Sequence, residues 1–563
     1  MEAGHARLRS AFDPPGTAAP PARTRAGWTA AGRAGLVAVP VAFWALLFAY
    51  PMVSIVERAL APGGYLDLGP AVRVLAEPTT RAVFWFSFWQ AAVSTSITLV
   101  LGLPAAYTFA RRDFRGRKVL EGLLTAAFVM PTVVVALAFR SVLAPLGLGS
   151  GLVAILAAHC FFNYVVVVRT VGVVWADLDP SAAEAARTLG ATRAQAFRRI
   201  TLPSLAPAIA SAAAIVFLFT FTSFGVVLVL GGPAYSTVEV EIWRRWTQDL
   251  DPGAAVALAL CQMLAVAAVV AVSLWFGRHR ARSVALRPRD PLPRRRGGLA
   301  VATTVAACVL LVGLPLGALV VRAFSAGGRP ALSNWTRLGS NPRQSVLAVA
   351  PLEALANSVV IAVAATIVAV CVGGCAAVVV ARRRTGRAAA AGRALDVALL
   401  LPLAASAVTI ALGFLVAFGR PPFDLRTSPA LIPLAHALVA VPFVVRLVAP
   451  ELGSIDPRLH DAAATLGAAP ARVWRVVDLP IVWRALLVAA GFAFCISLGE
   501  FGATLFLARP DLPTVPVAIA RLLSKPGSAN LGQAASLGVV LVAITAAVVL
   551  LLERWRPREL GDF

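Results

Sequence analysis

The sequence DPSAAEAARTLGATRAQAFRRITLP at residues 179–203 returns as DPRLHDAAATLGAAPARVWRVVDLP at residues 456–480. Each copy has an acidic residue followed by two alanines, then a glycine, an aromatic residue and a Leu-Pro pair at the same spacing. A polar block of fixed spacing, repeated inside a hydrophobic chain, indicates two equivalent docking elements for a partner outside the membrane. The defining residues are Glu184, Ala185, Ala186, Gly190, Phe197 and Pro203 in the first copy and Asp461, Ala462, Ala463, Gly467, Trp474 and Pro480 in the second.

The composition is that of an integral membrane protein. Of the 563 residues, 59% are hydrophobic, and the mean hydropathy is +0.81. Several apolar runs exceed the roughly 18 residues needed to span a bilayer. The formal net charge is +24, but the arginines lie in short loops between apolar runs. Cytoplasmic loops of membrane proteins carry this excess of basic residues, so the charge indicates topology rather than nucleic-acid binding.

The hydropathy pattern predicts about twelve transmembrane helices, six in each half of the chain. The predicted spans are 35–57, 84–110, 119–140, 150–176, 204–230 and 253–277, then 298–322, 354–381, 395–418, 428–451, 481–508 and 531–553. Because six is an even number, both halves enter the membrane in the same direction and form a parallel repeat. The expected fold is therefore all-α, as two parallel six-helix repeats.

Charge and hydropathy also divide the chain into segments. We expect a disordered basic tail at 1–34, a first transmembrane domain at 35–277, a basic linker at 278–297, a second such domain at 298–553 and a short tail at 554–563. Twelve spans place the basic loops, both repeated blocks, both termini and the linker on the cytoplasmic side.

The internal repeat extends beyond the two blocks. The repeat pairs His159 with His436 and Arg169 with Arg446 at an offset of 277, but Arg111 with Arg382 and Pro131 with Pro402 at 271. We expect the six-residue difference to lie in the outer loop at 420–426, because outer loops tolerate insertions.

Each repeated block has the signals of a helix–turn–helix knuckle. Asp179-Pro180 and Asp456-Pro457 suit helix starts, and Ser181 with Glu184 forms a candidate capping box. Gly190 and Gly467 fit helix ends that require a left-handed backbone. The alternative is an amphipathic helix lying on lipid, but lipid binding does not require an acid, a glycine and an aromatic residue at fixed spacing.

These residues resemble the EAA loop of the permease subunits of ATP-binding-cassette (ABC) importers, in both halves of the chain. The resemblance implies a type I importer transmembrane fold in which each knuckle docks on a cytoplasmic ATPase. Asp461 departs from the pattern because it replaces the usual glutamate. Its shorter side chain keeps the carboxylate, so we expect docking to survive on that side, with lower strength.

The chain has no phosphate-binding GxxxxGK[ST] loop, because neither Lys118 nor Lys525 follows a glycine. We therefore expect a transport permease rather than an enzyme. It would work with two copies of an ABC ATPase, which bind ATP and Mg²⁺, and with an extracellular or periplasmic substrate-binding protein. The expected location is the bacterial cytoplasmic membrane, and the expected mechanism is alternating access.

The substrate is less defined by the sequence. Residues 221–242 and 496–519 resemble the fused permeases of the thiamine and ferric-iron importer group, and both substrates stay open. Glu500 lies in an apolar run, and its repeat partner is the neutral Ser223. A carboxylate there is costly unless it is paired or faces water. It would suit a cationic substrate, or else pair with an arginine or the backbone. The candidate pathway residues are Ser223, Phe224, Glu500 and Phe501.

The repeat also pairs two histidines and two arginines inside the apolar spans, and the twelve spans allow one alternative fold. His159 and His436 suit either a metal path or hydrogen-bonded structural histidines, and without further ligands at recognisable spacing no metal site is predicted. Arg169 and Arg446 are interpreted as interfacial anchors. A secondary transporter of the major-facilitator type also has twelve spans in parallel halves, and the loop RRDFRGRK at 111–118 superficially resembles its basic signature. That alternative does not predict the twin docking blocks.

Overall fold

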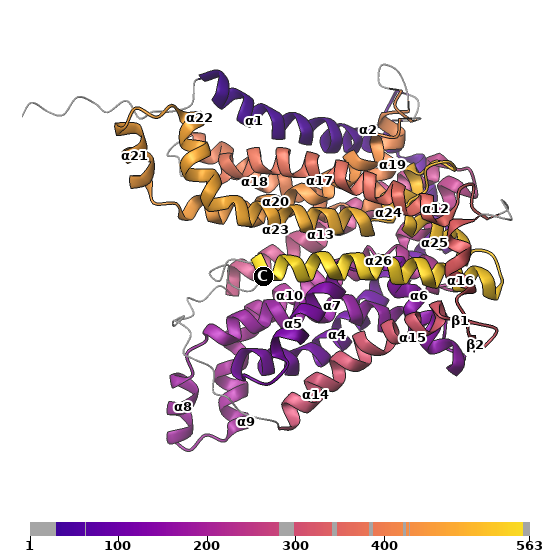
Figure 1. Ribbon diagram of the computed structural model, residues 1–563, viewed down its shortest axis with the longest axis horizontal. Coiled ribbons are helices and arrows are strands. Elements are labelled where there is room, and N and C mark those ends of the chain that lie inside the picture. The colour runs from indigo at the N-terminus through magenta and orange to yellow at the C-terminus, as the bar shows by residue number, and fades with distance from the viewer. Residues whose placement is uncertain are drawn as a thin grey trace, which may run out of the picture.

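The computed structural model describes residues 30–61, 64–280, 298–340, 346–381, 387–419, 424–426 and 428–555. Most of the predicted tail at 1–34, the linker at 278–297 and the tail at 554–563 lies outside these residues. The described part is almost entirely helical (Figure 1), which confirms the predicted all-α class. A small antiparallel hairpin, β1 (Ser325–Ala326) with β2 (Arg329–Pro330), was not predicted.

The first half of the chain is a succession of long apolar helices joined by short ones. Its elements are α1 (Ala30–Trp44), η1 (Ala45–Ala49), α2 (Tyr50–Leu60), α3 (Gly69–Ala76), α4 (Pro78–Arg111), α5 (Arg117–Val129), α6 (Thr132–Leu143), η2 (Ala144–Leu146), α7 (Leu152–Asp177), α8 (Ser181–Thr188), α9 (Arg193–Ala196), η3 (Phe197–Thr201), α10 (Leu202–Phe221), α11 (Gly225–Leu230), α12 (Val238–Thr247) and α13 (Pro252–Arg280).

The second half repeats this order. Its elements are α14 (Leu299–Cys308), η4 (Val309–Gly313), α15 (Leu314–Ala323), the hairpin, α16 (Ser333–Thr336), η5 (Arg337–Gly339), α17 (Pro351–Ala381), α18 (Arg387–Ala404), α19 (Ala407–Ala417), α20 (Leu431–Ser454), α21 (Pro457–Thr465), α22 (Pro470–Val473), η6 (Trp474–Asp478), α23 (Leu479–Gly499), α24 (Gly502–Leu507), α25 (Val515–Leu523) and α26 (Ser528–Trp555). Prolines begin α4, α13, α17 and α21, where a missing amide hydrogen costs no helical hydrogen bond.

Ten helices in the described residues are long and apolar enough to cross a membrane, or up to twelve if each of two bent pairs is one span. The bent pairs correspond to the predicted spans 119–140 and 395–418, which the sequence analysis took as ordinary helices. The chain turns by 109° between α5 and α6, and by 98° between α18 and α19. At the first bend, Met130 is extended because it precedes Pro131. At the second, Ser406 is extended and its Oγ accepts the N–H of Thr409, which caps α19.

The bends also correct the expected position of the six-residue difference between the halves. The helix after the bend begins at Thr132 in the first half and at Ala407 in the second, a spacing of 275. Pro402 lies inside α18, which ends two residues later at Ala404, whereas α5 ends two residues before Pro131, at Val129. Four of the six extra residues thus lie before the second bend and not in the loop at 420–426. They add about one turn to α18, and an added helical turn preserves packing.

Two other predicted spans, 204–230 and 481–508, are each interrupted. α10 ends at Phe221, and a separate short helix, α11, begins at Gly225. α23 ends at Gly499, and α24 begins at Gly502. Each break lies next to a candidate pathway residue, since Ser223 and Phe224 occupy the first break and Glu500 and Phe501 the second.

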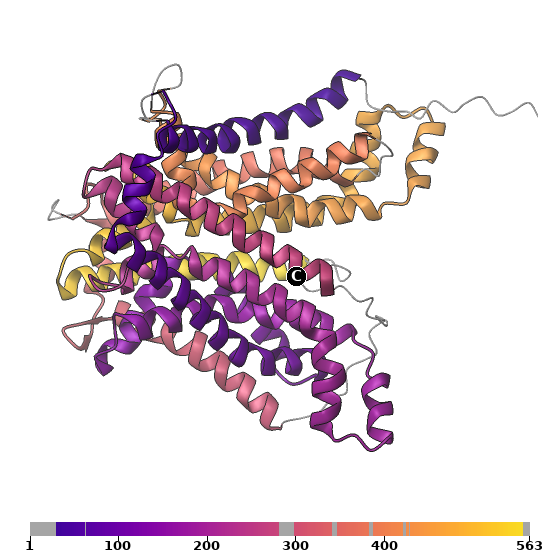
Figure 2. The ribbon, with the colours of Figure 1, turned by 180° about the vertical axis from the view of Figure 1, so that it is seen from behind.

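The two halves exchange their first helices. α1 packs against α17, and α2 packs against α19, so the N-terminal span lies with the second half. In return, α14 packs against α4, and α15 packs against α6. Figures 1 and 2 show α1 beside the orange helices of the second half and α14 beside the purple helices of the first. The predicted halves are therefore interleaved in space.

Both repeated blocks lie at the same end of the molecule. In Figures 1 and 2, α8 with α9 and α21 with α22 project from this end, which we call the knuckle end. The short helices α12, α16 and α25 lie at the opposite end, which we call the distal end. The common end agrees with the parallel repeat predicted from the even number of spans.

Candidate functional site

A cavity of about 460 Å³ lies between the two halves. Its walls are mainly apolar and include aromatic rings from both halves, namely Phe128, Phe219, Phe443 and Phe492. α5, α7 and α10 line it from the first half, and α20, α23 and α26 from the second. A space of this size, enclosed by both repeats, is a candidate translocation pathway.

Two arginines related by the repeat line this cavity. The Arg169 guanidinium donates a hydrogen bond to Thr125 Oγ1. The Arg446 guanidinium lies 3.5 Å from the carboxylate of Asp396, and Thr125 and Asp396 are themselves repeat equivalents. The interpretation of these arginines as interfacial anchors stays a prediction, and both side chains also contribute to the cavity wall.

Glu500 also lines the cavity, but its carboxylate is anchored. The side chain is 8% exposed. Its two oxygens accept hydrogen bonds from the backbone N–H groups of Ala503 and Thr504 at 2.8 and 2.9 Å. His436 Nε2 lies 3.2 Å from Oε2. The predicted pairing with backbone groups is thus present, and it caps the start of α24.

This anchoring makes a testable prediction for Glu500. Replacement by alanine leaves two buried amides without their acceptor, so Glu500→Ala should lower the free energy of unfolding by about 3 kcal/mol. The matched control is Ser223→Ala, its repeat equivalent, for which we expect about 1 kcal/mol. Thermal unfolding of the purified variants measures both. Equal losses in the two variants would contradict the anchoring role of the carboxylate.

His159 and His436 occupy equivalent buried positions beside the two breaks. His159 lies between the hydroxyls of Ser94 (3.1 Å) and Ser223 (2.9 Å). His436 lies between Ser497 and Thr504, at 2.7 and 2.8 Å. Both ring nitrogens of each histidine thus have hydrogen-bond partners, which supports the structural alternative. Ser223 contacts His159 and does not border the cavity.

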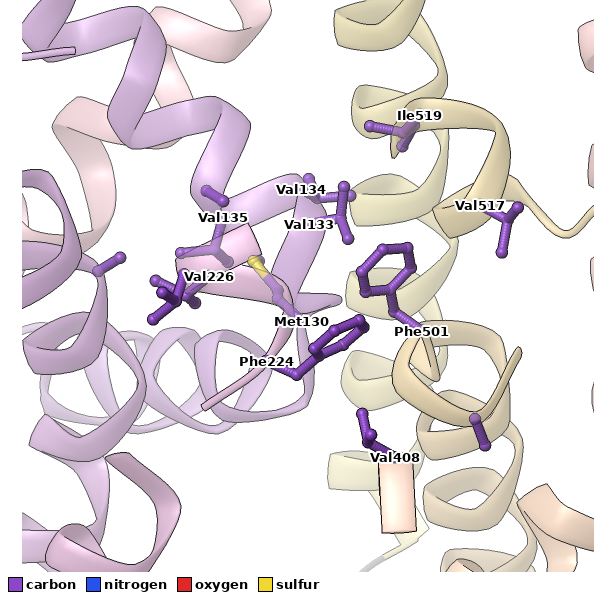
Figure 3. Close-up of a cluster of buried hydrophobic side chains, with 14 of the residues drawn as sticks. Met130, Val133, Val134, Val135, Phe224, Val226, Val408, Phe501, Val517 and Ile519 are labelled. Carbon is purple, nitrogen blue, oxygen red and sulfur yellow. The ribbon is translucent and has the colours of Figure 1, made fainter. Parts of the chain in front are cut away.

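Phe224 and Phe501 meet between the halves on the distal side of the cavity. Their rings stack with centroids 5.5 Å apart, and the residues are 6% and 2% exposed. Figure 3 shows the stacked pair between Met130 of the first half and Val408 of the second. The two candidate pathway phenylalanines therefore meet between the halves and are not among the residues that line the cavity.

The glycines that follow or precede these residues allow the close approach. A Cβ added at Gly225 would clash with Thr132 Oγ1 and lie 3.0 Å from the Phe501 ring. A Cβ at Gly499 would lie 3.3 Å from Cγ of Pro131. The bends of the two helix pairs and the breaks of the two interrupted helices thus contact each other. This contact explains why prolines, glycines and polar residues occur together at the bends and breaks.

Glu239, which sequence reasoning missed, joins the halves near the distal end. It lies in α12 and is 1% exposed. Gln262 Nε2 of α13 donates to its Oε1 at 2.7 Å, and Ser406 at the start of α19 also bonds to it. Burial raises the pKa of the Glu239 carboxyl from about 4.5 to about 8, although both hydrogen bonds lower that pKa.

The raised pKa predicts a pH-dependent stability. A folded-state pKa above the unfolded value means that the unfolded chain loses its proton first, so stability falls as pH rises from about 4.5 to about 8. Arg245 and Glu241 on the same helix are paired with each other at 3.0 Å, so they offset one another. Thermal unfolding between pH 5 and 8 should show the decline, and Glu239→Gln should flatten it. An unchanged slope in the variant would contradict this assignment.

The knuckles have the predicted helix–turn–helix form, and their glycines adopt the expected backbone. Gly190 has φ +93° and Gly467 has φ +76°, the left-handed conformation that favours glycine. Asp456 Oδ1 accepts the N–H of Arg458, and Asp179 Oδ1 that of Ser181. The capping box lies at Thr192 and Gln195, not at Ser181 and Glu184 as expected, because Thr192 begins the second helix.

The other block residues divide into exposed and packed groups. Glu184, Ala185, Gly190, Asp461, Ala462 and Gly467 are exposed, whereas Ala186 and Ala463 are half-buried. Phe197 stacks on Trp175 at 6.2 Å, which attaches the first knuckle to its own half, and Trp474 is half-buried. Pro203 and Pro480 each follow a π-helical turn, since a proline lacks the amide hydrogen for a regular bond.

Sequence reasoning missed one exposed pair. Leu189 and Leu466 are repeat equivalents, immediately before the two glycines, and they are 88% and 87% exposed. The signal was present in the alignment of the two blocks, as TLG in both copies. Two large apolar side chains projecting at equivalent positions suit a protein contact.

Comparison with known proteins agrees with this architecture. Residues 98–284 match the family described as "Binding-protein-dependent transport system inner membrane component". Relatives extend the match over most of the chain. One is the thiamine transport system permease protein ThiP of Escherichia coli (strain K12), 27% identical over 451 residues, 77% of this chain and 81% of that protein.

These matches support an ABC importer permease. The permease is also 26% identical to ThiP of Brucella abortus (strain 2308) over 492 residues, 83% of this chain and 86% of that protein. A shorter match is the putative 2-aminoethylphosphonate transport system permease protein PhnV of Salmonella typhimurium (strain LT2), 33% identical over 164 residues, 29% of this chain and 61% of that protein. The fold is that of type I importer membrane domains, and the permease is a multi-pass protein of the cytoplasmic membrane.

Proposed function

We propose that this permease forms the pathway of a thiamine importer and is driven by two separate ATPase subunits. The observation that carries the proposal is the cavity between the halves. Both repeats line it, the Phe224–Phe501 stack closes it on the distal side, and the knuckles project at the other end. This is an inward-facing arrangement for alternating access if the knuckle end is cytoplasmic.

Coupling is proposed to occur at the two knuckles. Each offers an exposed carboxylate, Glu184 or Asp461, and an exposed leucine, Leu189 or Leu466. A leucine flanked by polar residues can fill an apolar groove on a partner. Because the knuckles are duplicated, the proposal assigns one ATPase subunit to each, and ATP with Mg²⁺ binds to those subunits. A separate binding protein would deliver substrate to the distal end.

Thiamine suits the chemistry of the cavity better than ferric iron does. Thiamine is an organic cation with two aromatic rings, and the four cavity phenylalanines offer stacking and cation–π contacts. Glu500 adds a negative charge at the cavity wall. Ferric iron prefers several oxygen ligands, whereas the wall is mainly apolar. Relatives named as thiamine permeases over most of the chain support the same choice.

The test is uptake by proteoliposomes that contain the permease, its ATPase and its binding protein. We expect ATP-dependent uptake of labelled thiamine, no uptake without ATPase, and no ATP hydrolysis by the permease alone. Ferric iron should not compete with thiamine. Uptake of ferric iron without thiamine uptake would overturn the substrate, and ATP hydrolysis by the pure permease would overturn the coupling scheme.

One observation favours a second candidate substrate. Arg169 and Arg446 line the cavity, and arginine is suited to phosphate-like groups. A zwitterion such as an aminophosphonate would use these arginines together with Glu500, and one relative carries that substrate in its name. Competition by 2-aminoethylphosphonate, abolished in Arg169→Gln and Arg446→Gln, would favour it over thiamine.

A further inference from the structure

A second cavity lies under the first knuckle. Its volume is about 750 Å³, and it is enclosed by α8, by η3 and by the knuckle-side ends of α4, α7 and α10. Tyr107 and Arg111 line it from α4, Trp175 from α7, and Arg199 from η3. Transport through the central cavity makes no use of this space.

The second half differs at the same place. Ala183 and Thr201 line the cavity under the first knuckle, and the repeat replaces them with His460 and Asp478. There, His460 Nε2 lies 2.7 Å from Asp478 Oδ1, and Asp478 is only 5% exposed. A hydrogen bond thus links α21 to η6 across the gap that stays open in the first half.

The open cavity continues a lipid-facing stripe of α4. Val93, Ile97 and Val100 follow each other at helical spacing and are 37%, 36% and 72% exposed. Because α4 is a membrane span, exposed apolar residues on its surface face acyl chains. Tyr107, 38% exposed, is two turns further along and lines the cavity. An acyl chain along the stripe would therefore bring its headgroup to the cavity.

The cavity lining has the chemistry of a headgroup site. Tyr107 and Trp175 pack with ring centroids 5.4 Å apart, and such amphipathic rings prefer the level of the headgroups. Arg111 donates to the Leu178 carbonyl at 2.7 Å, which fixes its guanidinium at the end of α7. Arg199 is exposed on the opposite wall. Asp179 also lines the cavity, and its Oδ1 accepts the N–H of Ser181.

We propose that this cavity binds the headgroup of an anionic phospholipid from the leaflet at the knuckle end. Arg111 and Arg199 would contact the phosphate, and the acyl chains would lie along the α4 stripe. The repeat equivalents of Tyr107 and Arg199 are Val378 and Val476, so we expect one such site per chain. The site would attach the first knuckle to the membrane, while the His460–Asp478 pair stiffens the second.

Native mass spectrometry of the full-length permease in neutral detergent tests the site. The probes are phosphatidylglycerol, phosphatidylcholine and inorganic phosphate. We expect one tightly retained phosphatidylglycerol per chain, and no equivalent binding of the other two. The double variant Ala183→His/Thr201→Asp, which copies the His460–Asp478 pair of the second half, should abolish this binding.

A second variant covers the case in which the double variant does not fold. Arg199→Ala should weaken phosphatidylglycerol binding about fivefold. Its matched control, Arg198→Ala, changes an exposed neighbour that does not line the cavity, and should bind as the wild type does. Undiminished binding in folded Ala183→His/Thr201→Asp or in Arg199→Ala would overturn the proposal, and so would equal retention of phosphatidylcholine. Displacement of the lipid by inorganic phosphate at similar concentration would also overturn it, because the site would then be one for a free anion.

Discussion

Valine at both Gly190 and Gly467 is expected to reduce ATP-dependent uptake about thirtyfold while the permease still folds. Both glycines have left-handed backbones, which cost an L-residue about 1–2 kcal/mol each and a β-branched residue more. Within the described part of the chain, and apart from the neighbouring residues of each glycine, nothing lies within 4 Å of an added Cβ at either position. The substitution therefore changes the backbone conformation of the knuckles and not their packing. Uptake and co-purification of the ATPase measure the effect.

Asparagine at the same two positions is the matched control. Asparagine has a polar side chain of similar size to valine but tolerates the left-handed conformation. The asparagine variant should keep most of the uptake. If the asparagine variant loses as much uptake as the valine variant, the cause is a steric clash of the added side chain with the ATPase and not the backbone conformation. If neither variant loses uptake, the knuckles do not couple transport to ATP hydrolysis.

Removing the stacked rings, as Phe224→Ala with Phe501→Ala, is expected to open the pathway at its distal side. The centroids of the two rings lie 5.5 Å apart at the contact between the halves. Phe501 directly follows Glu500, which lines the cavity. Loss of the two rings should cost about 3–5 kcal/mol each in unfolding free energy. It should also let small solutes leave loaded proteoliposomes without ATP. The rate of that leak is the measurement.

A second stacked pair provides the control for the leak. Phe217 and Phe221 in α10 stack at 5.9 Å, but they pack against α4 and α13 and not across the halves. Phe217→Ala with Phe221→Ala should lower stability without a leak. A leak in this control, or none in the first variant, would show that the Phe224–Phe501 stack is not what seals the pathway.

The sequence predicted the helical class, the knuckles and the parallel repeat because each rests on a local pattern or on direct comparison of two copies. Gly190 and Gly467 have the left-handed backbone that their position after an alanine-rich helix predicts. The matched residues His159 and His436 are both buried with hydroxyl partners on both ring nitrogens, although those partners are not repeat equivalents. The substrate and the roles of the block residues stay predictions.

The bends and the cavity could not be predicted in the same way. Apolar composition continues through Met130 and Ala405, so hydropathy merged each bent pair into one span. The cavity wall depends on which faces of helices from different halves meet, and no local pattern encodes that. The contribution of Arg169 to the cavity wall was thus not predicted, and Glu239 was overlooked. Glu500 was singled out correctly, but its anchoring by the backbone of α24 becomes visible only when the helix break is known.

The exchange of first helices has a consequence for biosynthesis. α1 and α2 pack against α17 and α19, and α17 begins only at Pro351. At about 5–20 residues per second, the ribosome needs roughly 15–60 s after making α1 before its neighbours exist. The N-terminal span must therefore wait in the bilayer without its final contacts. The newly made first half is complete as a sequence but not as a structure until nearly half of the second, up to the end of α19 at Ala417, has followed it.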